Sequence, residues 1–231
     1  ADNHPEWIIT FWATVSIGAI CVGLNGWWNR DEIMYGIEDA EPKLLVGDEK
    51  RLARIAGADL PCPVVTIETG FDALTDGQGT HQLPPCDIAE DDPALILYTS
   101  GTTGRAKGAL ISHRSLVTFL SSAVFSGFRM MMLEMEAGKT VGDSTLPNCG
   151  LFSAPLFHLS GLFTGAITSL AVGMKTVWTT GRFDPGKILQ LIEREKATTW
   201  AALGSMASRV LDHPDFDKYD VSSISRLGSG G

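Results

Sequence analysis

The chain has 231 residues, with 18 Lys and Arg against 27 Asp and Glu, and its formal net charge is −9. This acidic balance disfavours nucleic acid as the main partner, because phosphate backbones are bound by clustered positive charge. With 44% hydrophobic and 19% charged residues, the composition is that of a globular protein with a buried core, and it argues against a disordered or collagen-like chain.

The cysteines form no C-x-x-C pair and have no His at metal-ligand spacing; they are Cys21, Cys62, Cys86 and Cys149. The sequence therefore indicates neither a zinc site nor a dense disulfide framework, and we expect a reducing compartment. The chain begins without Met and without the pattern of a secretory signal peptide. We interpret it as a piece of a longer protein.

An uncharged stretch runs from Trp7 to Trp28 and is long enough to meet the roughly 18-residue criterion for a membrane-spanning helix. Glycines interrupt this stretch, and it divides into a helical pattern over Trp7–Ile17 and a short apolar run over Ala19–Leu24. A buried helix followed by a buried parallel strand explains the same composition. We therefore expect no integral membrane association, and an integral membrane protein is the alternative.

Strand-sized apolar runs alternate with helix-sized amphipathic runs along the chain, which predicts an α/β fold with mostly parallel sheets flanked by helices. The predicted strands are Ala19–Leu24, Lys43–Val46, Val64–Ile67, Ala94–Thr99, Leu151–Ala154, Met174–Trp178, Thr199–Ala201 and Ser225–Gly228. Helices are predicted over Asp184–Lys196, where Asp184 and Pro185 form a good N-terminus, and over Gly204–Leu211. The polar stretch Gly70–Asp92 is interpreted as a surface loop or linker.

A run of methionines, Met130 to Met132, lies within the segment Arg129–Gly142. Two interpretations remain open for it. The methionines form a contact surface, or, as we favour, they belong to a helix end that packs on its neighbours.

The most informative segment follows the predicted strand Ala94–Tyr98. It runs from Thr99 to Gly108, is rich in Gly, Ser and Thr, and contains Lys107 before a helix that opens near Ser112 and His113. Small residues let successive backbone N–H groups turn toward a phosphate while hydroxyls donate beside them. The Walker A pattern is not met, because Ala106 and Gly108 flank the lysine.

The string Thr99–Gly108 resembles the signature of the adenylate-forming superfamily, which includes acyl-CoA synthetases, aryl-CoA ligases and amino-acid adenylating domains. Three further segments are similar to blocks of that superfamily: Asn3–Trp7, Ala154–Gly161 and Tyr219–Gly231. The resemblance implies that residues 1–231 form an incomplete N-terminal AMP-binding domain, with the phosphate loop over residues 98–108. The start of the domain, the later motifs and the small C-terminal domain are absent from this sequence, and Ala106 stands where the family usually has Pro.

The resemblance implies an AMP-forming acid–thiol ligase of the fatty-acid–CoA ligase type, an acyl-CoA synthetase that activates a carboxylic acid with ATP and passes it to coenzyme A. Its implied requirements are ATP, Mg²⁺ and coenzyme A, with no metal ligand in this chain. An aryl-CoA ligase, another acid-adenylating enzyme and a noncatalytic nucleotide-binding remnant are the alternatives. We expect the complete protein to be active, this piece alone to be inactive, and the location to be cytoplasmic, with peripheral membrane association as an alternative.

The site residues implied by the resemblance fall into three groups. Catalysis is expected from Lys107 and His158. Nucleotide binding is expected from Thr99, Ser100, Gly101, Thr102, Thr103, Gly104 and Lys107, and substrate binding from His158, Gly230 and Gly231. From the residues alone, His158 is also compatible with a buried core histidine, and the last two glycines with a frayed polar terminus.

Overall fold

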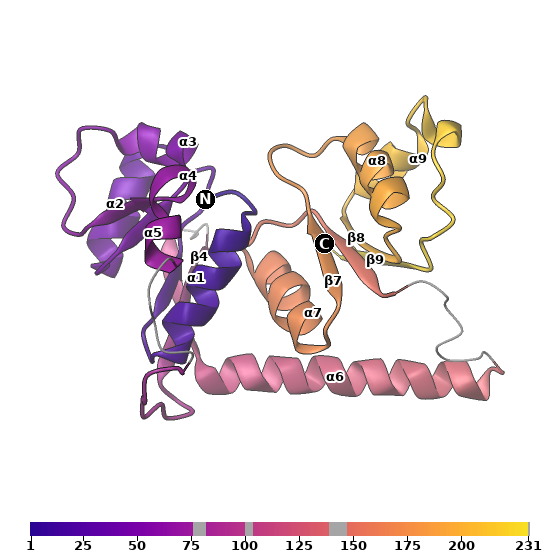
Figure 1. Cartoon of the computed structure of the whole chain (residues 1–231), viewed down its shortest axis with the longest axis horizontal. Helices are drawn as coiled ribbons and strands as arrows, with labels where there is room; N and C mark the ends of the chain where they lie inside the picture. Colours follow the sequence, from indigo (N-terminus) through magenta and orange to yellow (C-terminus); the bar gives the residue numbers. More distant parts are fainter. Residues whose placement is uncertain (76–81, 100–103, 139–146, 231) are drawn as a thin grey trace. The chain divides into compact units, whose positions relative to one another are not determined.

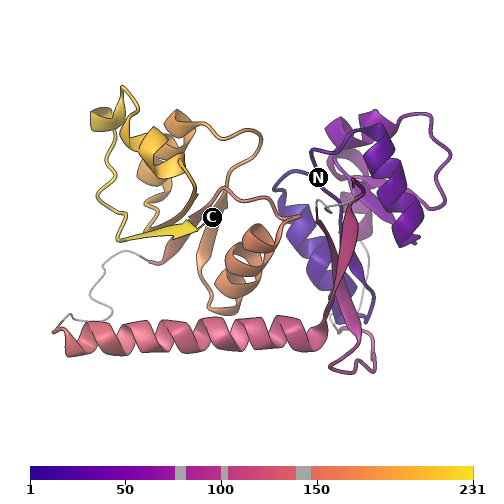
Figure 2. The ribbon, with the colours of Figure 1, turned by 180° about the vertical axis from the view of Figure 1, so that it is seen from behind.

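The computed structural model of the chain describes residues 1–75, 82–99, 104–138 and 147–230. These residues form two compact units (Figures 1 and 2). Unit 1 comprises Ala1–Ser115 together with Leu156–His158, and unit 2 comprises Leu116–Pro155 and Leu159–Gly231. The chain therefore returns to unit 1 for three residues in the middle of unit 2.

Unit 1 contains two small sheets and several helices. Its elements are α1 (Pro5–Ser16), β1 (Cys21–Gly23), α2 (Arg30–Ala40), β2 (Leu45–Gly47), α3 (Glu49–Leu52), η1 (Ala53–Ile55), β3 (Val64–Thr66), α4 (Ile67–Gly70), α5 (Asp72–Thr75), β4 (Pro93–Thr99) and β5 (Lys107–Ser112). In the first sheet, β4 lies between β1, which it pairs in parallel, and β5, which it pairs antiparallel. The second sheet is the parallel pair β2–β3.

The uncharged stretch from Trp7 to Trp28 does not form one helix. Helix α1 has 12 residues, begins at Pro5 and ends at Ser16, and strand β1 follows it. Phe11 and Val15 lie four positions apart on the buried face of α1. The predicted division into a helix and a strand is confirmed, and the spanning alternative over this stretch is wrong.

Helix α2 begins with a reciprocal pair of hydrogen bonds at its N-terminus. The Asn29 side chain accepts from the Glu32 backbone N–H, and the Glu32 carboxylate accepts from the Asn29 backbone N–H. This capping box satisfies two backbone donors that a helix end otherwise leaves unpaired. On the buried face of the helix, Ile33 and Ile37 pack with Trp28 and Ile55 in one apolar cluster. The cluster fixes α2 against unit 1.

Unit 2 is built on a parallel sheet of order β7-β6-β8-β9. Its elements after α6 (His113–Glu136) are β6 (Cys149–Phe152), the π-helical segment η2 (Ser160–Ile167), α7 (Thr168–Ala171), β7 (Lys175–Trp178), α8 (Pro185–Glu195), β8 (Thr199–Leu203), α9 (Met206–Leu211), η3 (Phe216–Lys218) and β9 (Arg226–Gly230). Strand β6 lies between β7 and β8, and all four of its residues are buried.

Helix α8 shows how the sequence specifies unit 2. The Asp184 side chain caps its first turn by accepting from the N–H groups of Gly186 and Lys187. Its apolar residues then recur on one face, and Ile188, Leu189 and Ile192 are at most 2% exposed. They pack against β6 and β8 in the core of the unit. The predicted helix Asp184–Lys196 is confirmed to within one residue at each end.

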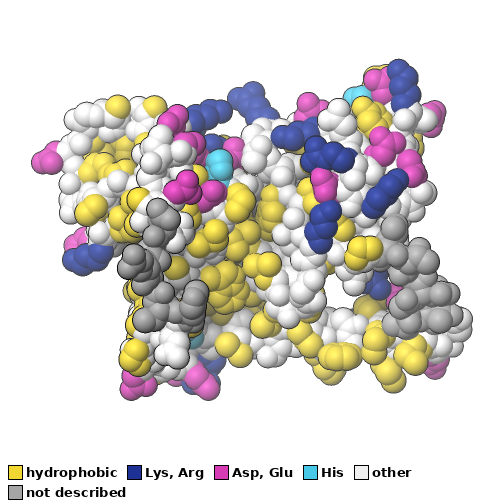
Figure 3. All heavy atoms as spheres, in the orientation of Figure 1, with side chains coloured by type: hydrophobic (Ala, Val, Ile, Leu, Met, Phe, Trp, Pro, Cys, Tyr) yellow, Lys and Arg dark blue, Asp and Glu magenta, His cyan; other side chains and the backbone are white. Residues whose placement is uncertain are grey.

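Helix α6 has 24 residues, of which only Leu116 is buried. By length and composition it could cross a membrane, although a single helix of this kind is weak evidence for a span. The methionine run lies near the end of this helix, as predicted, but Met130 and Met132 are exposed, so these two side chains do not show the predicted packing on neighbours. Figure 3 shows hydrophobic side chains along this helix at the lower edge of the view.

The predicted strands are all present, with ends shifted by a few residues. Strand β5 was not predicted, and it makes part of the first sheet antiparallel. The predicted helix Gly204–Leu211 begins at Met206, after Gly204 adopts a positive φ of 52°. The predicted loop Gly70–Asp92 contains the short helix α5 near its start.

Candidate active site

The predicted phosphate loop connects two strands, β4 and β5, that pair antiparallel. Strand β4 ends at Thr99 and β5 begins at Lys107, and these two residues face each other in the antiparallel register. The Thr99 hydroxyl donates to the Lys107 carbonyl at 3.4 Å. Within the predicted loop range 98–108, Tyr98 and Thr99 therefore belong to β4, and Lys107 and Gly108 belong to β5. The predicted nucleotide-binding residues Ser100 to Thr103 lie outside the described residues.

Helix α2 braces both ends of this connection. The Tyr98 hydroxyl donates to Asp39 Oδ2 at 2.5 Å, and the Tyr35 hydroxyl donates to the Ala106 carbonyl at 3.2 Å. The Arg105 guanidinium lies 5.4 Å from the centre of the Tyr35 ring, which is a cation–π distance. Three contacts from one helix therefore hold the two ends of the loop.

The Tyr98 phenol keeps its proton in this setting. Burial, followed by the hydrogen bond to Asp39 and the negative charge of that carboxylate, raises the pKa of Tyr98 above its ordinary value. The hydroxyl therefore remains a donor to Asp39 at neutral pH. The Tyr98 ring also packs edge-on against Trp28, with centroids 5.2 Å apart.

Gly104 has a φ of +90°, in the left-handed region that side chains with a Cβ rarely adopt. Among the residues that the structure describes, no atom lies within 4 Å of the position that a Cβ would take there. Backbone conformation, rather than space, therefore favours glycine at this point of the predicted loop.

Lys107 carries the positive charge at the start of β5. Its side chain is exposed, and it forms no ion pair with any residue that the structure describes. An ammonium group without a carboxylate partner is available to an anionic ligand, since no local negative charge competes for it. This electrostatic setting suits a lysine that binds phosphate.

His158 lies in the segment Leu156–His158, which belongs to unit 1 together with Lys107. Leu156 is buried and its backbone N–H donates to Asn3 Oδ1 at 2.9 Å. His158 itself is exposed. A buried core histidine, the alternative considered from the residues alone, is therefore wrong, because the imidazole is open to solvent.

Gly230 is the last residue of β9 and belongs to unit 2. It faces Leu203 in the parallel register of β8 and β9, so its backbone is part of a sheet. The alternative of a frayed terminus does not hold for Gly230. Gly231 lies outside the described residues.

Within the described ranges, no group of three or more His, Cys, Asp or Glu side chains could hold a metal ion. The roles considered for this chain rest on its Lys, His and backbone groups.

Sequence reasoning missed the residues that support the site. Asp39, Tyr35 and Asn3 contact the predicted site residues or their neighbours through side-chain hydrogen bonds. The position of Asn3 in the sequence could have indicated its role, because a polar side chain just ahead of an apolar helix is often a capping or buried hydrogen-bonding group. No local pattern marks Asp39, which is one of several acidic residues on α2.

The family described as AMP-binding enzyme matches residues 1–231. Among curated proteins, the chain is 28% identical to a feruloyl-CoA synthase from Amycolatopsis sp, over 99% of the chain and 42% of that protein. It is also 28% identical to 4-coumarate–CoA ligase CCL1 from Humulus lupulus, over 100% of the chain and 42% of that protein. The chain thus spans about two fifths of the length of these relatives.

Solved structures show the same fold. The crystal structure of ATP-bound MatB from Rhodopseudomonas palustris matches with a TM-score of 0.76 and 28% identity, over 99% of this chain and 43% of that one. The N-terminal domain of FACL13 from Mycobacterium tuberculosis matches with a TM-score of 0.79 and 23% identity, over 100% and 55% of the respective chains. The predicted α/β fold and the predicted resemblance are confirmed.

Proposed function

This chain belongs to the family of AMP-binding enzymes, and on that premise we propose that it is part of an AMP-forming ligase that joins a carboxylic acid to coenzyme A. The observation that carries the proposal is the strand pair β4–β5, held by contacts from α2, with an exposed Lys107 that has no ion-pair partner among the described residues. The two named relatives, one CoA ligase and one CoA synthase, support the same reaction class.

The reaction has two steps. A carboxylate oxygen attacks the α-phosphorus of ATP, a new O–P bond forms, and the bond to the bridging oxygen breaks and releases pyrophosphate. The thiol of coenzyme A then attacks the acyl carbon, a C–S bond forms, the C–O bond to AMP breaks, and the thiol proton is lost to solvent.

In the first step one anion attacks another, so catalysis depends on positioning and on neutralising charge. We assign Lys107 to the negative charge that develops on the departing pyrophosphate, with the loop residues Thr99 to Gly104 around its oxygens. His158 is assigned to the substrate carboxylate, which it orients by a hydrogen bond. Gly230 and Gly231 are assigned to the acyl and adenine groups.

The acid is proposed to be a fatty acid, because small residues along Leu162–Gly173 are compatible with an acyl tunnel. An aryl acid is the second candidate. The names of the curated relatives, which include 4-coumarate–CoA ligase and feruloyl-CoA synthase, favour it.

The test is carboxylate-dependent ATP–pyrophosphate exchange by the complete gene product, measured with a series of alkyl acids and a series of hydroxycinnamic acids. We expect exchange with one series at a kcat/KM at least tenfold above the other, which identifies the acid class. Binding of ATP without exchange for any acid would contradict the ligase and favour a noncatalytic nucleotide-binding protein.

The lysine is tested in the same assay with Lys107→Ala. Removing one charged donor to the transition state lowers kcat by about 100-fold. The matched control is Lys50→Ala, which removes an exposed lysine of α3 from the same unit and leaves exchange unchanged. Unchanged exchange in Lys107→Ala would contradict the role assigned to this residue.

A further inference from the structure

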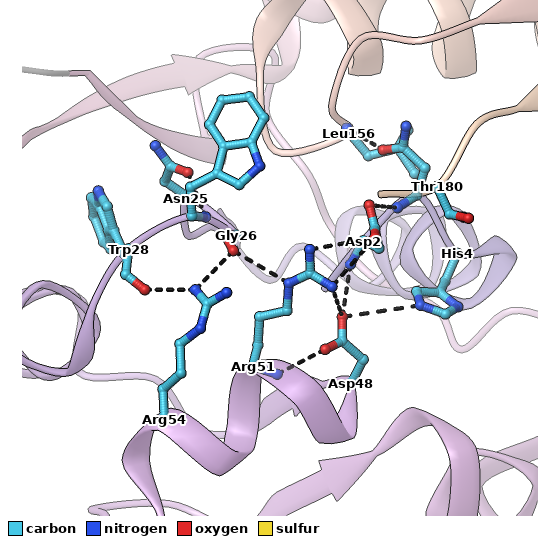
Figure 4. Close-up of polar contacts among 12 residues, drawn as sticks. Asp2, His4, Asn25, Gly26, Trp28, Asp48, Arg51, Arg54, Leu156 and Thr180 are labelled. Carbon is cyan, nitrogen blue, oxygen red and sulfur yellow. Dashed lines mark hydrogen bonds and ion pairs between the residues drawn. The ribbon is translucent and has the colours of Figure 1, made fainter. Parts of the chain in front are cut away.

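The segment Leu156–His158 is held in unit 1 by a hydrogen bond between residues 153 positions apart. The acceptor is the Asn3 side chain, which is 8% exposed, and the donor is the backbone N–H of Leu156, which is 1% exposed. A buried N–H group needs a partner, and Asn3 supplies it 2.9 Å away. Figure 4 shows this contact beside the polar network of unit 1.

The next residue, Phe157, lies against the loop that follows β1. Its ring packs edge-on against Trp27, with centroids 5.3 Å apart. Gly26 leaves room for this ring, because a Cβ added to Gly26 would come within 3.2 Å of Phe157 Cε1. The segment is therefore located through Leu156 on its backbone and through Phe157 on its side chain.

The loop that receives Phe157 is itself fixed by two arginines (Figure 4). Arg51 Nε donates to the Gly26 carbonyl at 3.2 Å, and Arg54 Nη1 donates to the same carbonyl at 3.0 Å and to the Trp28 carbonyl at 2.6 Å. Arg51 is held in turn by Asp48, at 3.1 Å, and by Asp2, at 3.4 Å. Side chains held by several hydrogen bonds keep one geometry, so the loop forms a firm surface for Phe157.

We propose that Asn3 is a positioning residue for adenylation: by accepting the Leu156 N–H, it fixes the backbone that carries His158 and thereby sets where the imidazole meets the substrate carboxylate. The proposal rests on the function proposed above. A displacement of about 1 Å in a group that orients a reactant can cost about 100-fold in rate, so a residue that never touches substrate can control kcat. Trp27 is expected to contribute in the same way through Phe157.

The experiment compares Asn3→Ala, Asn3→Asp, His158→Ala and the double variant Asn3→Ala/His158→Ala in the complete protein, by ATP–pyrophosphate exchange and by melting temperature. We expect Asn3→Ala to lower kcat by at least tenfold with KM for ATP within twofold. Asn3→Asp retains an acceptor oxygen and should recover kcat to within about threefold of the original protein. In the His158→Ala background, Asn3→Ala should cost less than a further twofold, because the group that it positions is already gone.

The matched control is Thr198→Ala in unit 2. Thr198 is also buried, and its side chain accepts a distant backbone N–H, that of Cys149, at 2.9 Å. This variant should lower the melting temperature about as much as Asn3→Ala does while kcat stays within twofold. Trp27→Ala should fold normally, because Trp27 is 69% exposed. This variant should lower kcat by about threefold or more.

Three results would overturn the proposal. They are a kcat for Asn3→Ala within twofold of the original protein, multiplicative losses in the double variant, or an equal loss of kcat in Thr198→Ala. If His158→Ala exchanges normally while Asn3→Ala does not, His158 is not the group that Asn3 positions. Absence of exchange in the unsubstituted protein would instead contradict the proposed function itself, so the two failures are distinguishable.

Discussion

The two units differ in what fills their interiors. Unit 2 is centred on apolar side chains of α8 packed against β6 and β8, and its ion pairs, such as Lys196 with Asp220, lie on the surface. Unit 1 has smaller sheets and buries a charged residue, Asp48, which is 1% exposed and bonded to Arg51. Apolar packing is non-directional, whereas hydrogen bonds fix particular atoms. Unit 1, which buries a carboxylate beside its apolar cluster, is the unit that carries Lys107 and His158.

The largest effect is expected in unit 2 from Leu189→Ala. Leu189 is 0% exposed in the core of that unit, and loss of its side chain leaves a cavity that costs about 4 kcal/mol of unfolding free energy. Urea unfolding measures the loss, and hydrogen exchange locates it. Amides of β6, β8 and α8 should exchange faster while those of α1 and α2 keep their protection.

The control for this substitution is Leu211→Ala, because Leu211 is 62% exposed on α9 of the same unit. It should change the unfolding free energy by less than about 0.5 kcal/mol. Equal acceleration of exchange in α1 and α2 by Leu189→Ala would break the comparison, since the two units would then unfold as one.

The next effect is expected from Asp48→Ala. Burial alone would raise the pKa of Asp48, but hydrogen bonds from the backbone N–H groups of Arg51 and Asp2, together with the Arg51 charge, hold it below its ordinary value. Removal of the Asp48 carboxylate takes away negative charge that neutralises the positive charge of the Arg51 guanidinium. The expected cost is about 3 kcal/mol, the lower end of the range for a broken buried pair.

Acid titration of stability tests the same carboxylate. At low pH the unfolded chain takes up this proton before the folded chain does, so the Asp48 contribution is fully present well above its ordinary pKa of about 3.9. It is lost as the pH falls through the lower pKa of the folded state. Asp48→Ala should therefore show a shallower fall in stability below about pH 4. If Asp48→Ala and the unsubstituted protein lost stability equally as the pH fell, this account would be contradicted. The control is Asp59→Ala, because Asp59 is exposed.

The smallest effect is expected from Lys196→Ala on the surface of unit 2. Lys196 Nζ lies 2.8 Å from Asp220 Oδ2, and the two side chains are 48% and 49% exposed. Water and salt screen such a pair, and holding two long side chains in one geometry opposes it. The melting temperature of Lys196→Ala should equal that of the unsubstituted protein, both at low and at high salt concentration. A fall as large as that of Asp48→Ala would show that surface charge, and not burial, determines the difference between the units.

Much of the fold could be predicted from the sequence because local pattern determines it. The periodic apolar residues of α8 and its Asp184 cap sufficed for that helix, and the apolar runs sufficed for the strands of the parallel sheet. Strand β5 was not predicted, because it begins with Lys107 and Gly108 and lies at a sheet edge with most of its side chains exposed. Its strand character comes from backbone pairing with β4, which no local pattern of β5 records.

The residues expected at the candidate site have a local sequence signal, whereas the residues that contact and support them do not. A Gly- and Thr-rich segment with a lysine is a local signal, and it pointed to Lys107. The contacts of Tyr35 with Ala106 and of Asp39 with Tyr98 join positions that are 71 and 59 residues apart, respectively. Such contacts depend on which faces of distant elements meet, and a single sequence gives no measure of that.

The hydrogen bond between Asn3 and Leu156 also affects the order in which the molecule forms. A chain is synthesised from its N-terminus, so Asn3 is made long before its partner, and the entropy lost in joining them rises with the length of chain between them. During synthesis, the interior of unit 1 is therefore incomplete until the segment Leu156–His158, which follows β6, has been made. A ribosome that pauses before residue 156 holds an unfinished unit 1, and the last contacts of the first-made part form only after much of the second has emerged.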